Sequence, residues 1–170
     1  KQKSRRKGGS TPSSKKSALN KSMFTSAVQK AQLEIIRALA FHLDDVFPAV
    51  KSALDFELFD EPILKKLGGL LIKEKKGVEL SAVIDHFDDR QEKELVSEIL
   101  FDEVHPDDPV QIIQECLATL KGRLIKDQIK TARLKMRELE SLGQDTEAII
   151  LEVAELQKQL QDLTVSLDRE

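Results

Sequence analysis

Aromatic residues and cysteine are scarce in this chain of 170 residues. It has no Trp or Tyr, and seven Phe account for the whole aromatic share of 4%. Sugar sites, base-stacking platforms and aromatic cages depend on flat amphipathic rings, so the composition argues against all three. The single cysteine, Cys116, excludes an internal disulfide framework and a cysteine zinc cluster. It fits a reducing compartment, and we therefore expect a cytoplasmic protein.

Long apolar segments are also missing. No apolar run approaches the roughly 20 residues that a membrane-spanning helix needs, so we expect no contact with a membrane. The sequence begins at Lys1 and shows no apolar core of a signal peptide. We interpret the chain as a fragment of a larger protein.

Motifs that carry chemistry are absent from the sequence. It contains no P-loop, no GxGxxG dinucleotide motif and no nucleophile elbow. His86 and His105 each have Asp neighbours, but those Asp residues are better interpreted as helix caps, because a transition-metal site needs more convergent ligands. His42 and Cys116 are predicted to be packing residues on apolar helix faces. We expect no catalytic, cofactor-binding or metal-binding residue and no enzyme activity of this chain alone.

Charge divides the chain into a basic leader and an acidic body. Residues 1–33 contain nine Lys or Arg and no acid, which leaves 18 basic and 30 acidic side chains in the remainder. Residues 1–22 have only Ala18 and Leu19 as apolar side chains and cannot offset the entropy of ordering. We predict a disordered basic linker over residues 1–24. Its charge could attract nucleic acid weakly and without sequence preference, although a solvated tether is the favoured interpretation.

Helical periodicity dominates the rest, and no segment alternates apolar and polar residues as a strand would. Apolar residues spaced by three and four, together with Asp and Pro start signals, define the expected helices. These helices cover residues 26–43, 47–54, 63–75, 82–87 and 89–101, and a last segment begins at Pro109. A cap at Asp44 or Asp45 is expected to precede the second helix. A capping box of Asp88 and Gln91 is expected to begin the fifth. Gly68 and Gly69 inside a helix indicate either a kink or a close neighbour. The prediction is an all-α fold with a small helical bundle over residues 25–121.

Residues 122–170 show two heptad segments separated by Gly143. The predicted seam positions are Ile125, Ile129, Ala132, Met136 and Leu139 in the first segment, and Ile149, Val153, Leu156, Leu160, Leu163 and Leu167 in the second. Residues 121–137 carry seven bases and one acid, whereas residues 138–170 carry nine acids and two bases. This pattern predicts an antiparallel helical hairpin with arms of about 20 residues, or roughly 30 Å.

Apolar residues outside the seam are the candidates for contact with a partner. Leu134, Leu151 and Val165 lie where a solvated helix would carry polar residues, although isolated exposed apolar residues are common. Leu163 and Leu167, near the end of the second arm, complete the predicted partner-binding set. Such residues are typical of a helix that docks in a groove through a few apolar anchors.

The order of these elements resembles the C-terminal domain of bacterial DNA primase. The similar segments are Gly122-Arg123-Leu124-Ile125, Ala132-Arg133, Gly143-Gln144-Asp145 and Leu156-Gln157-Lys158-Gln159-Leu160 in the closing region, Gln32–Leu39 in the opening helix, and Phe59-Asp60-Glu61-Pro62 at a helix start. The resemblance covers about residues 26–167. It implies a domain that docks primase onto the N-terminal collar of the hexameric replicative helicase, chiefly through the hairpin, and modulates helicase activity while RNA primers are made at the replication fork.

The resemblance also implies what belongs to the parent protein. That parent would be a DNA-directed RNA polymerase. Its zinc, and its magnesium or manganese, would be bound only by domains upstream of this chain. Three alternatives stay open: the related collar domain of the helicase, a generic helical adaptor, and a nucleic-acid-binding module that uses the basic leader.

Overall fold

The computed structural model describes residues 23–73, 79–102 and 108–167, with side chains as far as residue 164. Within these ranges it contains six α-helices, one 3-10 turn and no strand, which confirms the predicted fold class. The predicted linker lies outside the described residues except for its last two positions. Of these, Phe24 is only 3% exposed and belongs to the core. The packed bundle therefore begins before residue 25.

Helix α2 (Ala27–Val50) is the central element of the bundle. It starts with a capping box, in which the Ser26 hydroxyl accepts the N–H of Gln29 at 3.1 Å and Oε1 of Gln29 accepts the N–H of Ser26 at 3.1 Å. The helix kinks at His42 (φ −131°, ψ 30°) and continues to Val50. The predicted break before a second helical segment is confirmed, but it lies at His42, two to three residues before the predicted cap at Asp44 or Asp45.

Helix α3 (Pro62–Lys73) packs against α2 and runs through both glycines. The preceding 3-10 turn η2 (Phe56–Leu58) is capped by Asp55, whose Oδ1 accepts the N–H of Glu57 at 2.9 Å. A Cβ added to Gly68 would lie 2.3 Å from Cε1 of Phe56. The close neighbour, not a kink, therefore accounts for Gly68. The predicted stop at Gly77 lies outside the described residues.

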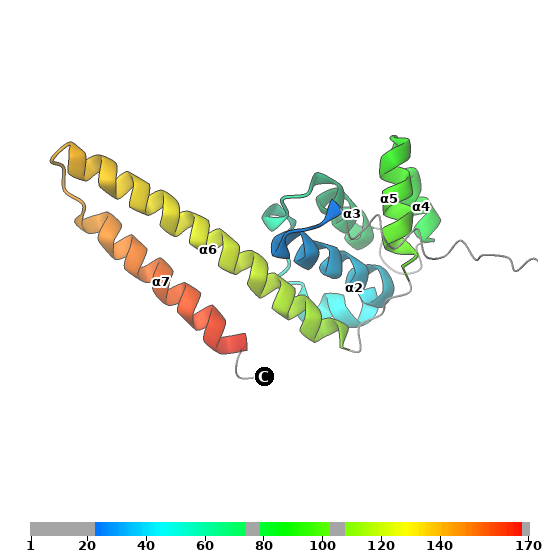
Figure 1. Ribbon diagram of the computed structural model, residues 1–170. Coiled ribbons are helices and arrows are strands. Elements are labelled where there is room, and N and C mark those ends of the chain that lie inside the picture. The colour runs from blue at the N-terminus through cyan, green and yellow to red at the C-terminus, as the bar shows by residue number, and fades with distance from the viewer. Residues whose placement is uncertain (1–22, 74–78, 103–107, 168–170) are drawn as a thin grey trace, which may run out of the picture.

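Two shorter helices, α4 (Leu80–Asp85) and α5 (Arg90–Leu100), pack against each other at one end of the bundle (Figure 1). Oδ1 of Asp89 caps α5 by accepting the N–H groups of Gln91 at 2.8 Å and Glu92 at 3.0 Å. The predicted cap at Asp88 is therefore one residue too early. The predicted start of the short helix at residue 82 is two residues too late.

Helix α6 (Pro109–Ser141) has 33 residues and a length of about 50 Å. Oδ1 of Asp108 caps it by accepting the N–H of Gln111 at 3.0 Å, and Pro109 occupies the first turn as predicted. Its first half packs against α2 and its second half against α7 (Glu147–Leu167). One unbroken helix therefore joins the bundle to the hairpin across the expected boundary at residue 122.

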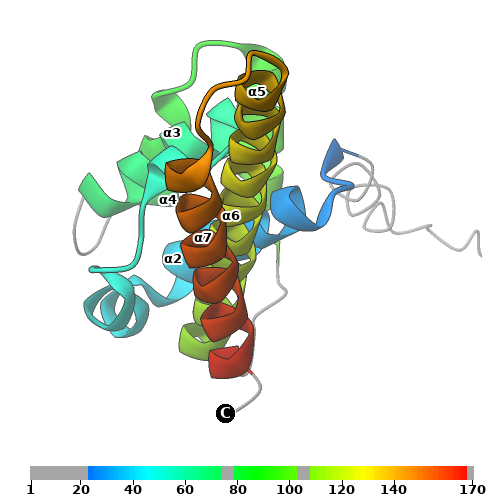
Figure 2. The ribbon, with the colours of Figure 1, turned by 90° about the vertical axis from the view of Figure 1, so that its left-hand side faces the viewer.

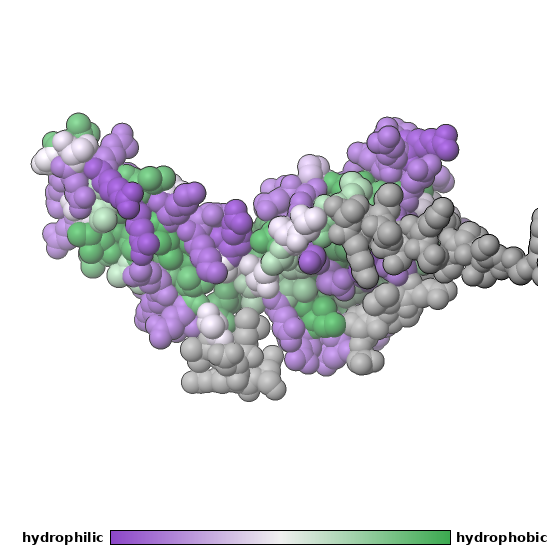
Figure 3. Space-filling model, viewed as in Figure 1, coloured by the Kyte–Doolittle hydropathy of each residue, from purple (hydrophilic) through white to green (hydrophobic). Residues whose placement is uncertain are grey.

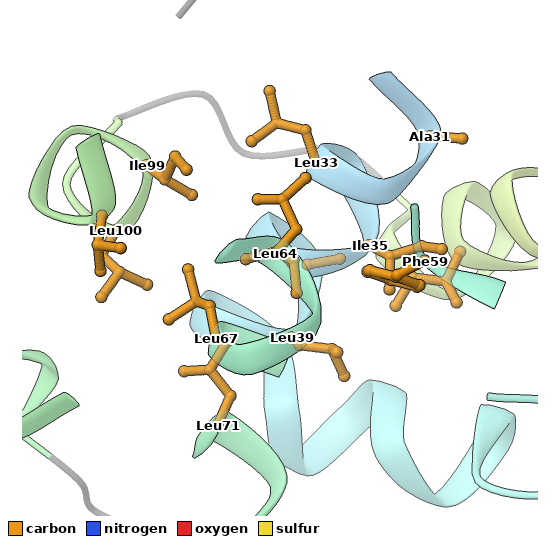
Figure 4. Close-up of a cluster of buried hydrophobic side chains, with 14 of the residues drawn as sticks. Ala31, Leu33, Ile35, Leu39, Phe59, Leu64, Leu67, Leu71, Ile99 and Leu100 are labelled. Carbon is orange, nitrogen blue, oxygen red and sulfur yellow. The ribbon is translucent and has the colours of Figure 1, made fainter. Parts of the chain in front are cut away.

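The core lies where α2, α3, α5 and the first half of α6 meet. Figure 4 shows Leu64, Leu67 and Leu71 of α3 beside α2, with Ile99 and Leu100 of α5 next to them. Helix α6 adds Ile113, Leu117 and Leu120 to the same cluster. All of these side chains are buried, so the first half of α6 is fixed by the bundle.

The hairpin extends away from the bundle, and α7 returns antiparallel to α6 (Figures 1 and 2). Gly143 adopts φ 66°, the left-handed conformation that favours glycine. Around it the N–H of Gln144 donates to the carbonyl of Leu139 at 2.9 Å, and the N–H of Gly143 donates to that of Glu140 at 3.1 Å. These two bonds form a Schellman motif, which ends α6 and turns the chain.

Candidate partner-binding surface on the hairpin

Reactive and metal-ligating side chains do not converge in the part of the chain that the structure describes. No group of three or more His, Cys, Asp or Glu among these residues could hold a metal ion. His42 lies at the kink of α2, His86 is the C-cap of α4, and His105 falls outside the described residues. The Arg37 guanidinium bonds Glu34 at 2.7 Å and Asp102, so these charges connect α2 to the chain after α5.

Cys116 is half-buried on α6 beside the core. Burial, with smaller contributions from the charges of Glu34 and Glu115, raises the pKa of its thiol from 9.0 to about 12. Because the thiolate is the reactive form, the folded protein should keep this sulfur unreactive at neutral pH. This agrees with a packing role.

We expect an alkylating reagent at pH 8 to modify Cys116 about two to three orders of magnitude more slowly in the folded chain than in urea, because the thiolate is rarer. The raised pKa also means that the thiol's contribution to stability is complete below pH 9.0 and is lost as the pH rises toward about 12. Stopped-flow or mass-spectrometric labelling rates measure the first effect. Equal rates in the folded and unfolded chain would contradict it.

The hairpin seam follows the predicted heptads. Ile129, Ala132 and Ile149 are buried, and Met136, Val153 and the other described seam side chains are half-buried, while their neighbours are exposed. At the end nearest the bundle, a Cβ added to Gly122 would lie 3.6 Å from Leu163 and 3.8 Å from Leu160. Figure 3 shows hydrophilic residues over much of the hairpin surface with apolar residues between them.

The five predicted partner-binding residues have different positions. Leu134 is 56% exposed and Leu151 is 65% exposed, whereas Leu163 is half-buried in the seam beside Gly122. The side chains of Val165 and Leu167 lie outside the described residues. Their contact with a partner, like that of Leu163, stays a prediction.

Leu134 and Leu151 face opposite directions. Leu134 is two residues from the seam positions Ala132 and Met136, and Leu151 is two residues from Ile149. Two residues correspond to about 200° around a helix, so each side chain points away from the other arm. One flat partner surface therefore cannot contact both of them.

Sequence reasoning missed two exposed apolar residues near the turn. Leu142, at the end of α6, is 65% exposed, and Ile150, in the first turn of α7, is 52% exposed. With Leu151 they form a set at the far end of the hairpin, which we call the distal apolar residues. Leu142 lies where heptad counting stops, and Ile150 is next to the seam residue Ile149. The heptad pattern therefore does not show that these two side chains are exposed and not part of the seam.

Comparison with models of protein families, with curated proteins and with solved structures found no match in any of the three. Among the described residues, no helix is both long and apolar enough to cross a membrane.

Proposed function

We propose that this chain is the helicase-binding domain of a bacterial DNA primase. It would dock the polymerase onto the N-terminal collar of the replicative helicase, modulate helicase activity, and so place primer synthesis at the replication fork. The observation that carries the proposal is the hairpin itself, an arm that extends from the bundle and exposes Leu142, Ile150 and Leu151 at its far end. The sequence resemblance supplies the identity of the partner.

The continuity of α6 supports a docking role. Its first half is buried in the bundle core through residues such as Ile113 and Leu117, and the same helix continues to Ser141 at the turn. A partner held at the turn is therefore connected to the bundle by one helix and not by a loop. Apolar residues on such an arm fit a contact in which a few anchors provide most of the binding energy.

The proposal is tested by titrating the labelled full chain with the replicative helicase hexamer of the same organism, and following fluorescence anisotropy at 0.1 M and 0.5 M salt. An apolar contact should persist at the higher salt concentration, because screening acts on charges. Absence of binding to the helicase at both concentrations would overturn the proposal and leave a generic adaptor. Primer synthesis by the chain alone would contradict its assignment as the non-catalytic part of the parent.

We expect Leu142→Ala and Leu151→Ala each to weaken helicase binding by about 1–3 kcal/mol, because each change removes an apolar anchor at the far end of the arm. Leu124→Ala is the matched control, since Leu124 is also exposed (43%) but lies on α6 near the bundle. Leu134→Ala tests the outer side of α6 separately. If the two distal variants bind with wild-type affinity while helicity is kept, the contact lies elsewhere on the hairpin or on the bundle.

A further inference from the structure

One side of the second half of α6 carries four basic residues in succession, and the row ends at the exposed Glu140. Lys126, Lys130, Arg133 and Arg137 each follow a seam residue by one position, and all four are exposed. Their spacing of four, three and four places them in one row over about 16 Å of helix. We call this row the basic stripe.

The neighbouring edge of α7 is uncharged. The residue that follows a seam residue lies about 100° further around its helix. Because the two helices are antiparallel and face each other, these residues of both helices reach the same face of the hairpin. On α7 these positions are Ile150, Ala154, Gln157, Gln161 and Thr164, all exposed. The acids Glu152, Glu155 and Asp162 precede seam residues and therefore lie on the opposite face.

The basic stripe is not neutralised within the described structure. No ion pair among the described residues joins α6 to α7, and none involves the four stripe residues. The next base toward the bundle is different, because Arg123 bonds Asp127 at 2.7 Å. That hydrogen bond and the charge of Asp127, with a smaller contribution from the charge of Asp60, raise the pKa of Arg123. The free positive charge therefore begins at Lys126.

We propose that the basic stripe binds the phosphate backbone of a nucleic-acid strand, without selecting bases, as a second binding surface whose cations are not part of the distal apolar set; of that set, only Ile150 lies on the same face. Four unpaired cations in a row complement a polyanion and would release its counterions. The amides of Gln157 and Gln161 border the stripe and are hydrogen-bond donors suited to phosphate oxygens.

The composition of this face favours nucleic acid over an acidic protein. Protein contacts depend on apolar or aromatic anchors, and this face offers only Ile150 and Ala154. It has no aromatic side chain on which a base could stack, so the contact is limited to the backbone. The proposal does not depend on the helicase, because it uses other residues and another kind of ligand.

The test compares two variants of the full chain with the same change in charge. Lys130→Glu/Arg133→Glu reverses two stripe residues, and Lys135→Glu/Lys158→Glu reverses two exposed bases of the same hairpin outside the stripe. Binding of a fluorescein-labelled 20-nucleotide single strand and of the matching 20-bp duplex is measured by anisotropy between 50 and 200 mM salt. Circular dichroism verifies that helicity is unchanged.

We expect the stripe variant to bind the tighter of the two probes at least tenfold more weakly than the control variant at 50 mM salt. Two lost phosphate contacts should also reduce the slope of log K against log salt by about 1–2, depending on whether the strand is single or paired. Preference for either probe supports the proposal and identifies the form of nucleic acid that is bound. Equal losses in the two variants, or no loss in either, would overturn it, because the basic leader or net charge would then explain all binding.

Two further measurements separate this surface from other partners. A 20-residue polyglutamate that displaces the probe as well as an unlabelled oligonucleotide does would overturn the proposal in favour of an acidic protein. The stripe variant should bind the helicase with wild-type affinity. If it does not, the stripe belongs to the helicase contact and is not a separate surface, whereas failure of the wild-type chain to bind helicase would affect only the proposed function.

Discussion

Replacing Gly68 with alanine is expected to lower the free energy of unfolding by about 1–3 kcal/mol, although alanine is the better helix former. The new Cβ would lie 2.3 Å from Cε1 and 2.7 Å from Cζ of Phe56, distances at which one of the groups must move. The loss is measured by urea or thermal unfolding of the full chain.

The Phe56 ring has little freedom to give way. It packs edge-on against Phe59, with ring centroids 5.1 Å apart and an interplanar angle of 76°. Phe59 is itself buried in the bundle core. Displacing Phe56 would therefore disturb the contacts between η2 and α3, so that the cost extends beyond a single pair of atoms.

Gly69→Ala is the matched control, with the opposite expected sign. No atom lies within 4 Å of a Cβ added to Gly69, and the residue is helical. Alanine should here raise the free energy of unfolding by up to about 1 kcal/mol, because it restricts the unfolded chain and favours the helix. Changes of the same sign at the two glycines would show that the contact with Phe56 does not govern Gly68.

Local sequence signals located the helices well where one residue type determines the start. Asp108 and Pro109 begin α6 as predicted, because an Asp cap followed by Pro suits the first turn and little else. Adjacent acids were less informative. Asp88 and Asp89 can both accept N–H groups, and the packing of the helix decides which of them does. Near Asp44 and Asp45 the break between two helical segments was predicted, but it lies at His42, and the buried Val46 and Val50 of the second segment continue the core face of α2.

The hairpin surface was predictable only where the heptad pattern applies. The exposure of Leu134 and Leu151 follows from their distance of two residues from seam positions. The basic stripe could also have been found in this way, since its members all follow seam residues by one. The other two distal residues, Leu142 and Ile150, could not, because the heptad pattern of the first arm ends at Leu139 and Ile150 directly follows the seam residue Ile149. Sequence spacing assigns Ile149 to the seam. The structure confirms that Ile149 is buried there and that Ile150 is exposed.

Ile149→Asp should separate the two arms of the hairpin while the bundle stays folded. Ile149 is 6% exposed in the seam, and burying a carboxylate there should destabilise the hairpin by about 3 kcal/mol or more. Helix α7 has 21 residues and packs against α6, and a lone helix of this length is only marginally stable in water. The core residues of α2 and α3 do not contact this position, so their protection should persist.

Hydrogen exchange measured by mass spectrometry distinguishes the two parts of the chain. In the Ile149→Asp variant, amides of residues 147–164 should lose most of their protection, while those of residues 31–39 in α2 should keep it. Ile150→Asp is the matched control, because it adds the same charge one residue later, at a side chain that is 52% exposed. That variant should retain protection in α7. Similar loss in both variants would mean that Ile149 does not hold the arms together, and complete unfolding with Ile149→Asp would mean that the hairpin and the bundle form one cooperative unit.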